Sequence, residues 1–327
     1  SYVGQPLAVI AAESSEAAAR ARRLVKVAID EEPPVLEIDD AEEKGLFIGP
    51  ERRIENGDLE AGWAAARHRL SGVFRSEGQE QLYFESQAAL VWQSEGELHV
   101  HSSTQNPTEV QKVVADMLGV GQHRVVCEVR RLGGGFGGKE TQAALPALMA
   151  ALAVHQTGRP ARMVYDRDDD MVTTGKRHAF RTRYEVGFDD DGRITACELV
   201  LRSNGGAFAD LSTAVLERAM LHADNAYYLP AVSIRARVCR THLPPSTAFR
   251  GFGGPQGMAV IENVMQEIAA RLGKDSLDVR RANLYDANLE TVASSRVATA
   301  VAETRVRTPY GQVVRNNLVP EIFERLE

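Results

Sequence analysis

The residues of this chain best suited to chemistry are two glycine-rich segments, each with a phenylalanine at its centre. The tetrapeptide Gly-Phe-Gly-Gly occurs at residues 135–138 and again at residues 251–254, each time between strand-like and helix-like sequence. Glycines let backbone N–H groups approach a ligand where a Cβ would clash, and a helix start favours negative charge. Unless the repetition is chance, the pair predicts two cradles that grip one extended anionic ligand, such as a phosphate-bearing cofactor.

Other glycine-loop chemistries fit the first segment less well. Gly133, Gly135 and Gly138 satisfy G-x-G-x-x-G, but no acidic residue follows at a strand end about twenty residues on, as dinucleotide binding requires. Lys139 nearly completes a P-loop, yet Glu140 stands where Ser or Thr should hold magnesium, and its carboxylate would repel a triphosphate. The sequence contains no G-x-S-x-G elbow for a serine hydrolase.

Composition and charge indicate a soluble globular protein. The 327 residues suffice for two ordinary domains or one large one, and 44% of them are hydrophobic. The net charge of −7 argues against a nucleic-acid partner, and no apolar run approaches the length of a membrane span. Cys127, Cys197 and Cys239 lack metal-binding spacing, so we expect buried thiols and a cytoplasmic location.

Hydrophobic periodicity predicts the elements that must position the glycine segments. Near the start it predicts a strand at residues 2–12, a helix at 14–26 and a strand at 25–29, followed by an acidic, irregular stretch to about residue 56. Further strands are expected at 70–76, 88–93, 98–102, 125–132, 162–165, 181–188, 194–203 and 232–239, and helices at 106–118, 141–157 and 258–272. The alternating strands favour an α+β fold with mixed sheets.

Residues 131–141 and 247–257 resemble the signature loops of the molybdenum hydroxylases, and more closely those of the molybdopterin-binding subunit of the xanthine dehydrogenases. Further matching stretches are 103–106, 166–171, 174–178, 216–220, 280–285 and 308–311. The similarity covers nearly the whole chain apart from a variable insert at about 287–306. It implies the C-terminal part of a small α/β hammerhead-type domain at 1–45, a linker at 46–62, and the first half of a molybdopterin-binding domain at 63–327.

The resemblance also implies residues that hold the cofactor. Gln105 matches a glutamine that hydrogen-bonds an oxygen ligand of molybdenum, a place where a neutral amide donates without adding charge. Phe136 and Gly137 match the loop whose backbone approaches the metal centre. Arg250 matches a residue that contacts the anionic pterin. No side chain of this chain is expected to ligand the metal directly, because the pterin holds it.

Three more residues match substrate-binding positions of the family. Phe252 matches an aromatic residue that packs against the flat heterocycle, although it could be an ordinary core phenylalanine. Glu140 and Arg218 match the pair that reads purine substituents, and Arg218 would stabilise charge developing on the ring during catalysis. Taken separately they could be a helix-start acid and a surface base. Together they favour purines over aldehydes, because the aldehyde-oxidising relatives usually carry apolar residues there.

The implied activity is hydroxylation of hypoxanthine or xanthine towards urate, with electrons passing to Fe–S clusters and FAD on partner domains or subunits. The general base of the family and the remaining cofactor loops lie in a C-terminal half that this sequence does not contain. We therefore expect the isolated chain to hold molybdopterin weakly and to be inactive. The alternatives are a hydroxylase of aldehydes or other N-heterocycles, and a non-catalytic assembly module with purely structural glycine loops.

Overall fold

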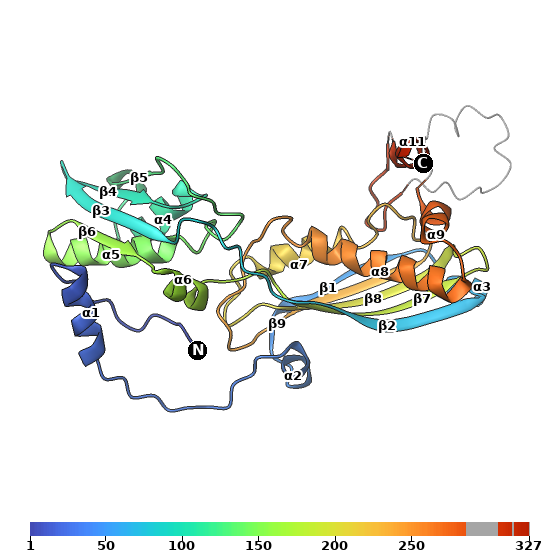
Figure 1. The fold of residues 1–327 in the computed structure, drawn as a ribbon, viewed down its shortest axis with the longest axis horizontal. Coiled ribbons are helices and arrows are strands. Elements are labelled where there is room, and N and C mark those ends of the chain that lie inside the picture. Colours follow the sequence, from blue (N-terminus) through green and yellow to red (C-terminus); the bar gives the residue numbers. More distant parts are fainter. Residues whose placement is uncertain (286–306, 316, 327) are drawn as a thin grey trace.

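The computed structural model describes residues 1–285, 307–315 and 317–326, so the expected variable insert at 287–306 lies outside the described residues. The chain forms two lobes, each built on a sheet with helices packed against it (Figure 1). Both sheets mix parallel and antiparallel pairs, which confirms the expected α+β fold with mixed sheets. The connections at about residues 77–87 and 174–179 join the lobes.

The larger lobe contains a five-stranded sheet in the order β1-β9-β8-β7-β2. Its strands are β1 (Phe47–Asn56), β2 (His68–Ser76), β7 (Phe180–Phe188), β8 (Ile194–Asn204) and β9 (Val232–Cys239). Helices α7 (Ser212–Met220), α8 (Gly254–Leu272) and α9 (Ser276–Asn283) lie along one face, and α3 (Leu59–Ala65) lies near one end (Figure 1). Leu199, Ile234 and Met265 are fully buried between the sheet and these helices.

The smaller lobe contains a four-stranded sheet in the order β5-β4-β3-β6. Its strands are β3 (Ala88–Ser94), β4 (Glu97–Ser102), β5 (Val125–Glu128) and β6 (Ala161–Val164), and its helices are α4 (Pro107–Leu118), η1 (Gln122–Arg124), α5 (Ala144–Thr157) and α6 (Arg167–Thr173). Small and β-branched side chains such as Val91, Val114 and Ala147 form the core. Asn106 Oδ1 accepts the Glu109 N–H at the start of α4, and Gly119 ends the helix at φ +67°, as the sequence predicts.

The expected β-α-β unit at the N-terminus is wrong in its strands. The helix is present as α1 (Ser15–Leu24), but residues 2–12 and 25–29 contain no strand. Leu7 is 68% exposed and Ile29 is 70% exposed, so these apolar segments have no described sheet edge on which to pair. A strand needs a neighbouring strand for its backbone hydrogen bonds, and sequence periodicity alone does not supply one.

Most of the stretch expected as a linker at 46–62 is regular in the structure. Residues Phe47–Asn56 form edge strand β1, which pairs with β9 through a register shift between Ile48 and Arg52. An edge strand tolerates proline, charge and bulges, which explains why this charged stretch looks irregular in sequence. The location of the domain boundary itself stays a prediction.

Helix α2 (Ile38–Glu43) is fastened to the large sheet by ion pairs. Glu42 pairs with Arg181, with Arg183 at 2.9 Å and with Arg202 at 2.8 Å. The side chains of Arg181 and Arg202 are only 7% and 9% exposed, so these charges depend on the α2 carboxylates. The last described helix is α11 (Val319–Leu326).

Candidate functional site

The two glycine loops meet at the junction of the lobes. The first loop follows β5 of the small sheet and the second follows β9 of the large sheet. The Arg250 N–H donates to the Phe136 carbonyl at 2.9 Å, and the Thr141 and Thr247 hydroxyls lie 3.3 Å apart. A Cβ added to Gly137 would lie 2.8 Å from the Ala248 carbonyl, so the backbones touch there. The sequence prediction that the two loops converge is confirmed.

Both copies of the tetrapeptide fold as the same turn. The Gly138 N–H donates to the Gly135 carbonyl at 2.8 Å, and the Gly254 N–H donates to the Gly251 carbonyl at 2.9 Å. The two central residues have φ of +53° and +100° in the first copy, and +49° and +98° in the second. Positive φ at both central positions is the mark of a type I′ turn. The repeated letters therefore encode a repeated backbone conformation, which chance repetition does not explain.

Glu85 holds both ends of the first loop. Its carboxylate accepts the Gly133 N–H at 2.8 Å, and its N–H donates to the Gly133 carbonyl at 3.0 Å. The Lys139 ammonium donates to the Glu85 carbonyl and to Ser103 Oγ, both at 2.6 Å. Burial lowers the pKa of Lys139, and the charge of Glu85 opposes that shift. Because Lys139 is 0% exposed, it cannot reach a phosphate as a P-loop lysine would.

A buried polar network that was not predicted from the sequence lies behind the same loop. Gln87 Nε2 donates to the Gly138 carbonyl at 3.0 Å and to the Tyr83 hydroxyl at 3.1 Å. The Tyr83 hydroxyl donates to Asp170 Oδ1 at 2.6 Å. Burial raises the pKa of Tyr83, which keeps the phenol protonated as a donor. The alternation of Gln81, Tyr83 and Gln87 with exposed Leu82 and Phe84 was the available signal.

Gln105 is oriented so that its amide nitrogen is free. Its Oε1 accepts the Gly137 N–H at 2.8 Å and the Lys139 N–H at 3.3 Å. A Cβ on Gly135 would lie 2.4 Å from that oxygen, so only glycine allows this approach. The side chain is exposed, and Nε2 has no partner in the described part of the chain. The Gln105 amide can therefore donate a hydrogen bond to a ligand in front of the loop.

The second loop is held from behind by Arg177. Its guanidinium donates to the Arg250 carbonyl at 2.9 Å and lies 4.1 Å from the Phe249 ring centre, and burial lowers its pKa. The Arg250 guanidinium is exposed and makes no hydrogen bond or ion pair with the described residues. Arg250 thus combines a fixed backbone with a cation that is available to an anion.

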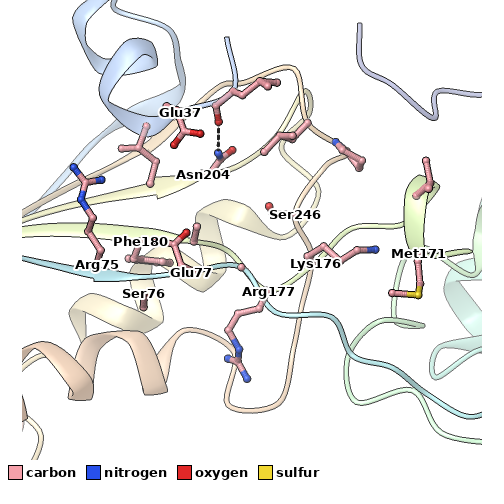
Figure 2. Close-up of a pocket in the computed structure, with 17 residues that line it drawn as sticks. Glu37, Arg75, Ser76, Glu77, Met171, Lys176, Arg177, Phe180, Asn204 and Ser246 are labelled. Atoms are coloured by element: carbon pink, nitrogen blue, oxygen red, sulfur yellow. Dashed lines mark hydrogen bonds between the residues drawn. The ribbon is translucent and has the colours of Figure 1, made fainter. Parts of the chain in front are cut away.

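A hollow of about 340 Å³ is lined by Arg177 and lies between the start of α2 and the ends of β2 and α6 (Figure 2). Its other cations are already paired, because Arg75 lies 2.6 Å from Asp39 and Lys176 lies 2.8 Å from Glu80. None of the site residues expected from the sequence lines it. The hollow therefore does not coincide with the glycine loops, whose front surface we regard as the candidate site.

Helix α7, which carries Arg218, packs directly against the second loop. A Cβ on Gly253 would lie 2.1 Å from the Val215 carbonyl of that helix. The Arg218 side chain is exposed and that of Glu140 is half-buried, and neither has a polar partner among the described residues. No described hydrogen bond or ion pair joins them to each other. The structure thus brings their segments to one junction and leaves both charges unpaired.

The two phenylalanines differ in their surroundings. Phe136 is 51% exposed, whereas Phe252 is half-buried and packs against the core of the large lobe. Helices α7 and α8 supply the core that Phe252 joins. Within the described chain, no group of three or more His, Cys, Asp or Glu is placed to hold a metal. None of the described helices has the length and apolar character needed to cross a membrane.

Comparison with known proteins identifies relatives of this chain. The family model of the molybdopterin cofactor-binding domain matches residues 40–284. Xanthine dehydrogenase of Dictyostelium discoideum is 42% identical over 99% of this chain, and xanthine dehydrogenase/oxidase of Mus musculus is 45% identical over 86% of it. The chain covers 23% and 21% of these proteins, or about a fifth of their length.

Solved structures share the fold. Quinoline 2-oxidoreductase from Pseudomonas putida 86 superposes with a TM-score of 0.82 at 24% identity, over 97% of this chain and 40% of that one. Aldehyde oxidoreductase from Desulfovibrio gigas also gives a TM-score of 0.82, at 25% identity, over 96% of this chain and 34% of its own. At this level of identity the likeness concerns the architecture alone.

Proposed function

Because this chain belongs to the molybdopterin cofactor-binding domain family, we propose that it supplies the first half of the cofactor site of a xanthine dehydrogenase. Its place within the larger enzyme would be the end of a hammerhead-type domain followed by the start of the molybdopterin-binding domain. The observation that carries the proposal is the contact of two identical type I′ glycine turns, one from each lobe.

The residues at the front of these turns fit a molybdopterin group. Gln105 offers an amide N–H and Arg250 offers an unpaired guanidinium, while the Gly137 N–H fixes the Gln105 amide by donating to its Oε1. These donors suit an anionic ligand with oxygen acceptors. When bound, the molybdenum centre supplies the oxygen-transfer and redox chemistry. The chain's own contribution is to bind the group and hold it in one orientation.

We assign substrate recognition to Glu140, Arg218 and Phe252. Glu140 would accept hydrogen bonds from purine N–H groups, and Arg218 would donate to the opposite edge and stabilise charge that develops on the ring. Phe252 would contact the flat face of the purine. The unpaired state of both charged groups supports this assignment, because neither is committed to a structural ion pair.

The complete enzyme would need partners beyond this chain. We propose Fe–S clusters and FAD on other domains or subunits, the remaining half of the molybdopterin domain, and a cytoplasmic location. The general base is assigned to that other half. Glu262 and Glu267 are not candidates, because Glu262 pairs with Arg280 at 2.8 Å and Glu267 accepts from Tyr184 at 2.7 Å. The isolated chain should therefore not form urate.

The double variant Glu140→Val with Arg218→Met tests the substrate assignment in the complete, molybdenum-loaded enzyme. We expect kcat/KM for xanthine to fall by roughly a hundredfold, because two polar contacts to substrate are lost, while turnover of a small aldehyde is retained. The exposed pair Glu43→Val with Arg20→Met is a matched control that should change neither. Unchanged xanthine kinetics in the first variant would favour the aldehyde or other N-heterocycle alternative.

A further inference from the structure

We propose that Gln142 is a positioning residue that fixes Glu140 relative to Arg218, an inference that rests on the proposed function. Gln142 lies two residues after Glu140, and its side chain links three segments. Its Nε2 donates to Asp210 Oδ2 at 3.1 Å, and its Oε1 accepts the Gly175 N–H at 3.2 Å. One amide thus ties the end of the first glycine loop to the connection before α7.

Asp210 lies in the connection that leads into α7. It has φ of +38°, in the left-handed region that Asp adopts more readily than most residues other than glycine. The helix start that follows is fixed by the Ser212 N–H, which donates to the Ala209 carbonyl at 2.7 Å, and by the Ser212 hydroxyl, 2.7 Å from His178 Nε2. Asp210 therefore lies directly before the helix that carries Arg218.

The Gln142–Asp210 contact is also the only side-chain hydrogen bond in the described chain between residues 139–143 and the β8–α7 connection. Its acceptor is a carboxylate, so the bond is charge-assisted and stronger than a neutral one. Glu140 and Arg218 have no direct contact, so their relative position depends on the contacts between their segments. This bridge acts beside the loop contact between Arg250 and Phe136. A shift of about 1 Å in such a spacing is enough to reduce catalysis markedly.

The bridge has a donor and an acceptor that can be exchanged. Gln142→Glu places two carboxylates against each other and breaks the bridge, while the Gly175 N–H still finds an acceptor. Asp210→Asn keeps an acceptor for Gln142 and should be mild. The double variant Gln142→Glu with Asp210→Asn restores one donor and one acceptor in reversed order. Asp210→Ala breaks the bridge from the other side, in case Gln142→Glu fails to fold.

The experiment measures kcat and KM of these variants in the complete, molybdenum-loaded enzyme with xanthine and with a small aldehyde. We expect Gln142→Glu and Asp210→Ala to lower kcat/KM for xanthine about tenfold, which corresponds to about 1.4 kcal/mol, with aldehyde turnover and molybdenum content unchanged. The double variant should return to within about twofold of the wild type.

Equal losses on both substrates, a loss of molybdenum, no loss on either substrate, or a double variant no better than Gln142→Glu would each overturn the inference. The Glu140→Val with Arg218→Met variant is assayed in the same series. If that variant discriminates between the substrates and the Gln142 series does not, the positioning role alone is wrong. If neither discriminates, the proposed purine specificity is wrong as well.

Discussion

Phe136 and Phe252 occupy equivalent positions in the two turns, yet they relate differently to the rest of the protein. Both adopt the left-handed backbone region, which costs a residue with a Cβ about 1 kcal/mol. Packing on the core of the large lobe offsets this free-energy cost for Phe252. Phe136 is 51% exposed, so burial offsets little of the cost there. A strained, exposed aromatic residue is better explained by contact with a ligand or partner than by folding stability.

Substituting each phenylalanine by glycine separates these roles. Phe136→Gly relieves the backbone strain and loses little burial, so we expect the free energy of unfolding to stay within about 0.5 kcal/mol of the wild type or to rise. Phe252→Gly removes core contacts and should cost about 2 kcal/mol. Urea denaturation of the two variants measures the difference. Equal destabilisation would show that the turns are structurally equivalent after all.

His178 makes the stability of the junction depend on pH. Burial is the main cause that lowers the pKa of His178 to about 3. In the unfolded chain its pKa is about 6.5, so between these values the proton binds only the unfolded state. Stability from this group is therefore present above about pH 6.5 and is lost as the pH falls below it.

We expect His178→Gln to flatten this dependence by about 1 kcal/mol per pH unit between pH 6 and pH 4. The difference between variant and wild type is the quantity to measure, by urea denaturation at each pH. Asp224 acts in the opposite direction, because burial raises its pKa to about 6, and its contribution is common to both proteins. Parallel pH profiles would contradict the account of His178.

At the level of single residues, the sequence predicted the residues on the loops better than the buried residues that hold those loops in place. Gln105, Phe136, Gly137 and Arg250 lie on or beside the two loops, as expected, although their roles stay predictions. Glu85 and the network around Tyr83 were missed. Their polar side chains resemble those of a surface connection until the fold buries them, and the burial depends on contacts between distant segments.

Among the elements, those with local signals were predicted well. The strand at 232–239 matches β9, and Gly119 ends α4 as expected, because periodicity and capping are properties of neighbouring residues. The strands expected at residues 2–12 and 25–29 are absent, because strand formation depends on pairing with another strand that is distant in sequence. Strand β1 within the expected linker was not predicted, because an edge strand with charge on both faces lacks the alternation that identifies a strand.

The attachment of α2 to the large sheet gives a prediction at this scale. Glu42→Ala removes the carboxylate shared by Arg181, Arg183 and Arg202, and should destabilise the protein by about 3 kcal/mol, because two nearly buried cations lose a partner. Glu43→Ala, on the same helix, is the control. Glu43 is exposed, so its loss should stay within about 0.5 kcal/mol. Similar unfolding free energies for the two variants would refute the anchoring role.

For the whole molecule, the central feature is that each lobe contributes one of the two glycine turns. Neither lobe can form the paired cradle alone, so the site depends on how the lobes are joined. The sequence could reveal that the turns are alike, but their contact through Phe136 and Arg250 follows only from the complete fold. The same reasoning explains why the meeting of the segments that carry Glu140 and Arg218 could not be predicted.

The most direct test is the molybdenum and pterin content of the complete enzyme carrying Gly137→Ala, with Gly119→Ala as the control. Both glycines have positive φ, but a Cβ at Gly137 would lie 2.8 Å from the Ala248 backbone, whereas a Cβ at Gly119 would meet nothing within 4 Å. If the paired turns hold the cofactor, Gly137→Ala loses most of its molybdenum and Gly119→Ala keeps it. Full molybdenum content in a folded Gly137→Ala enzyme would contradict the account.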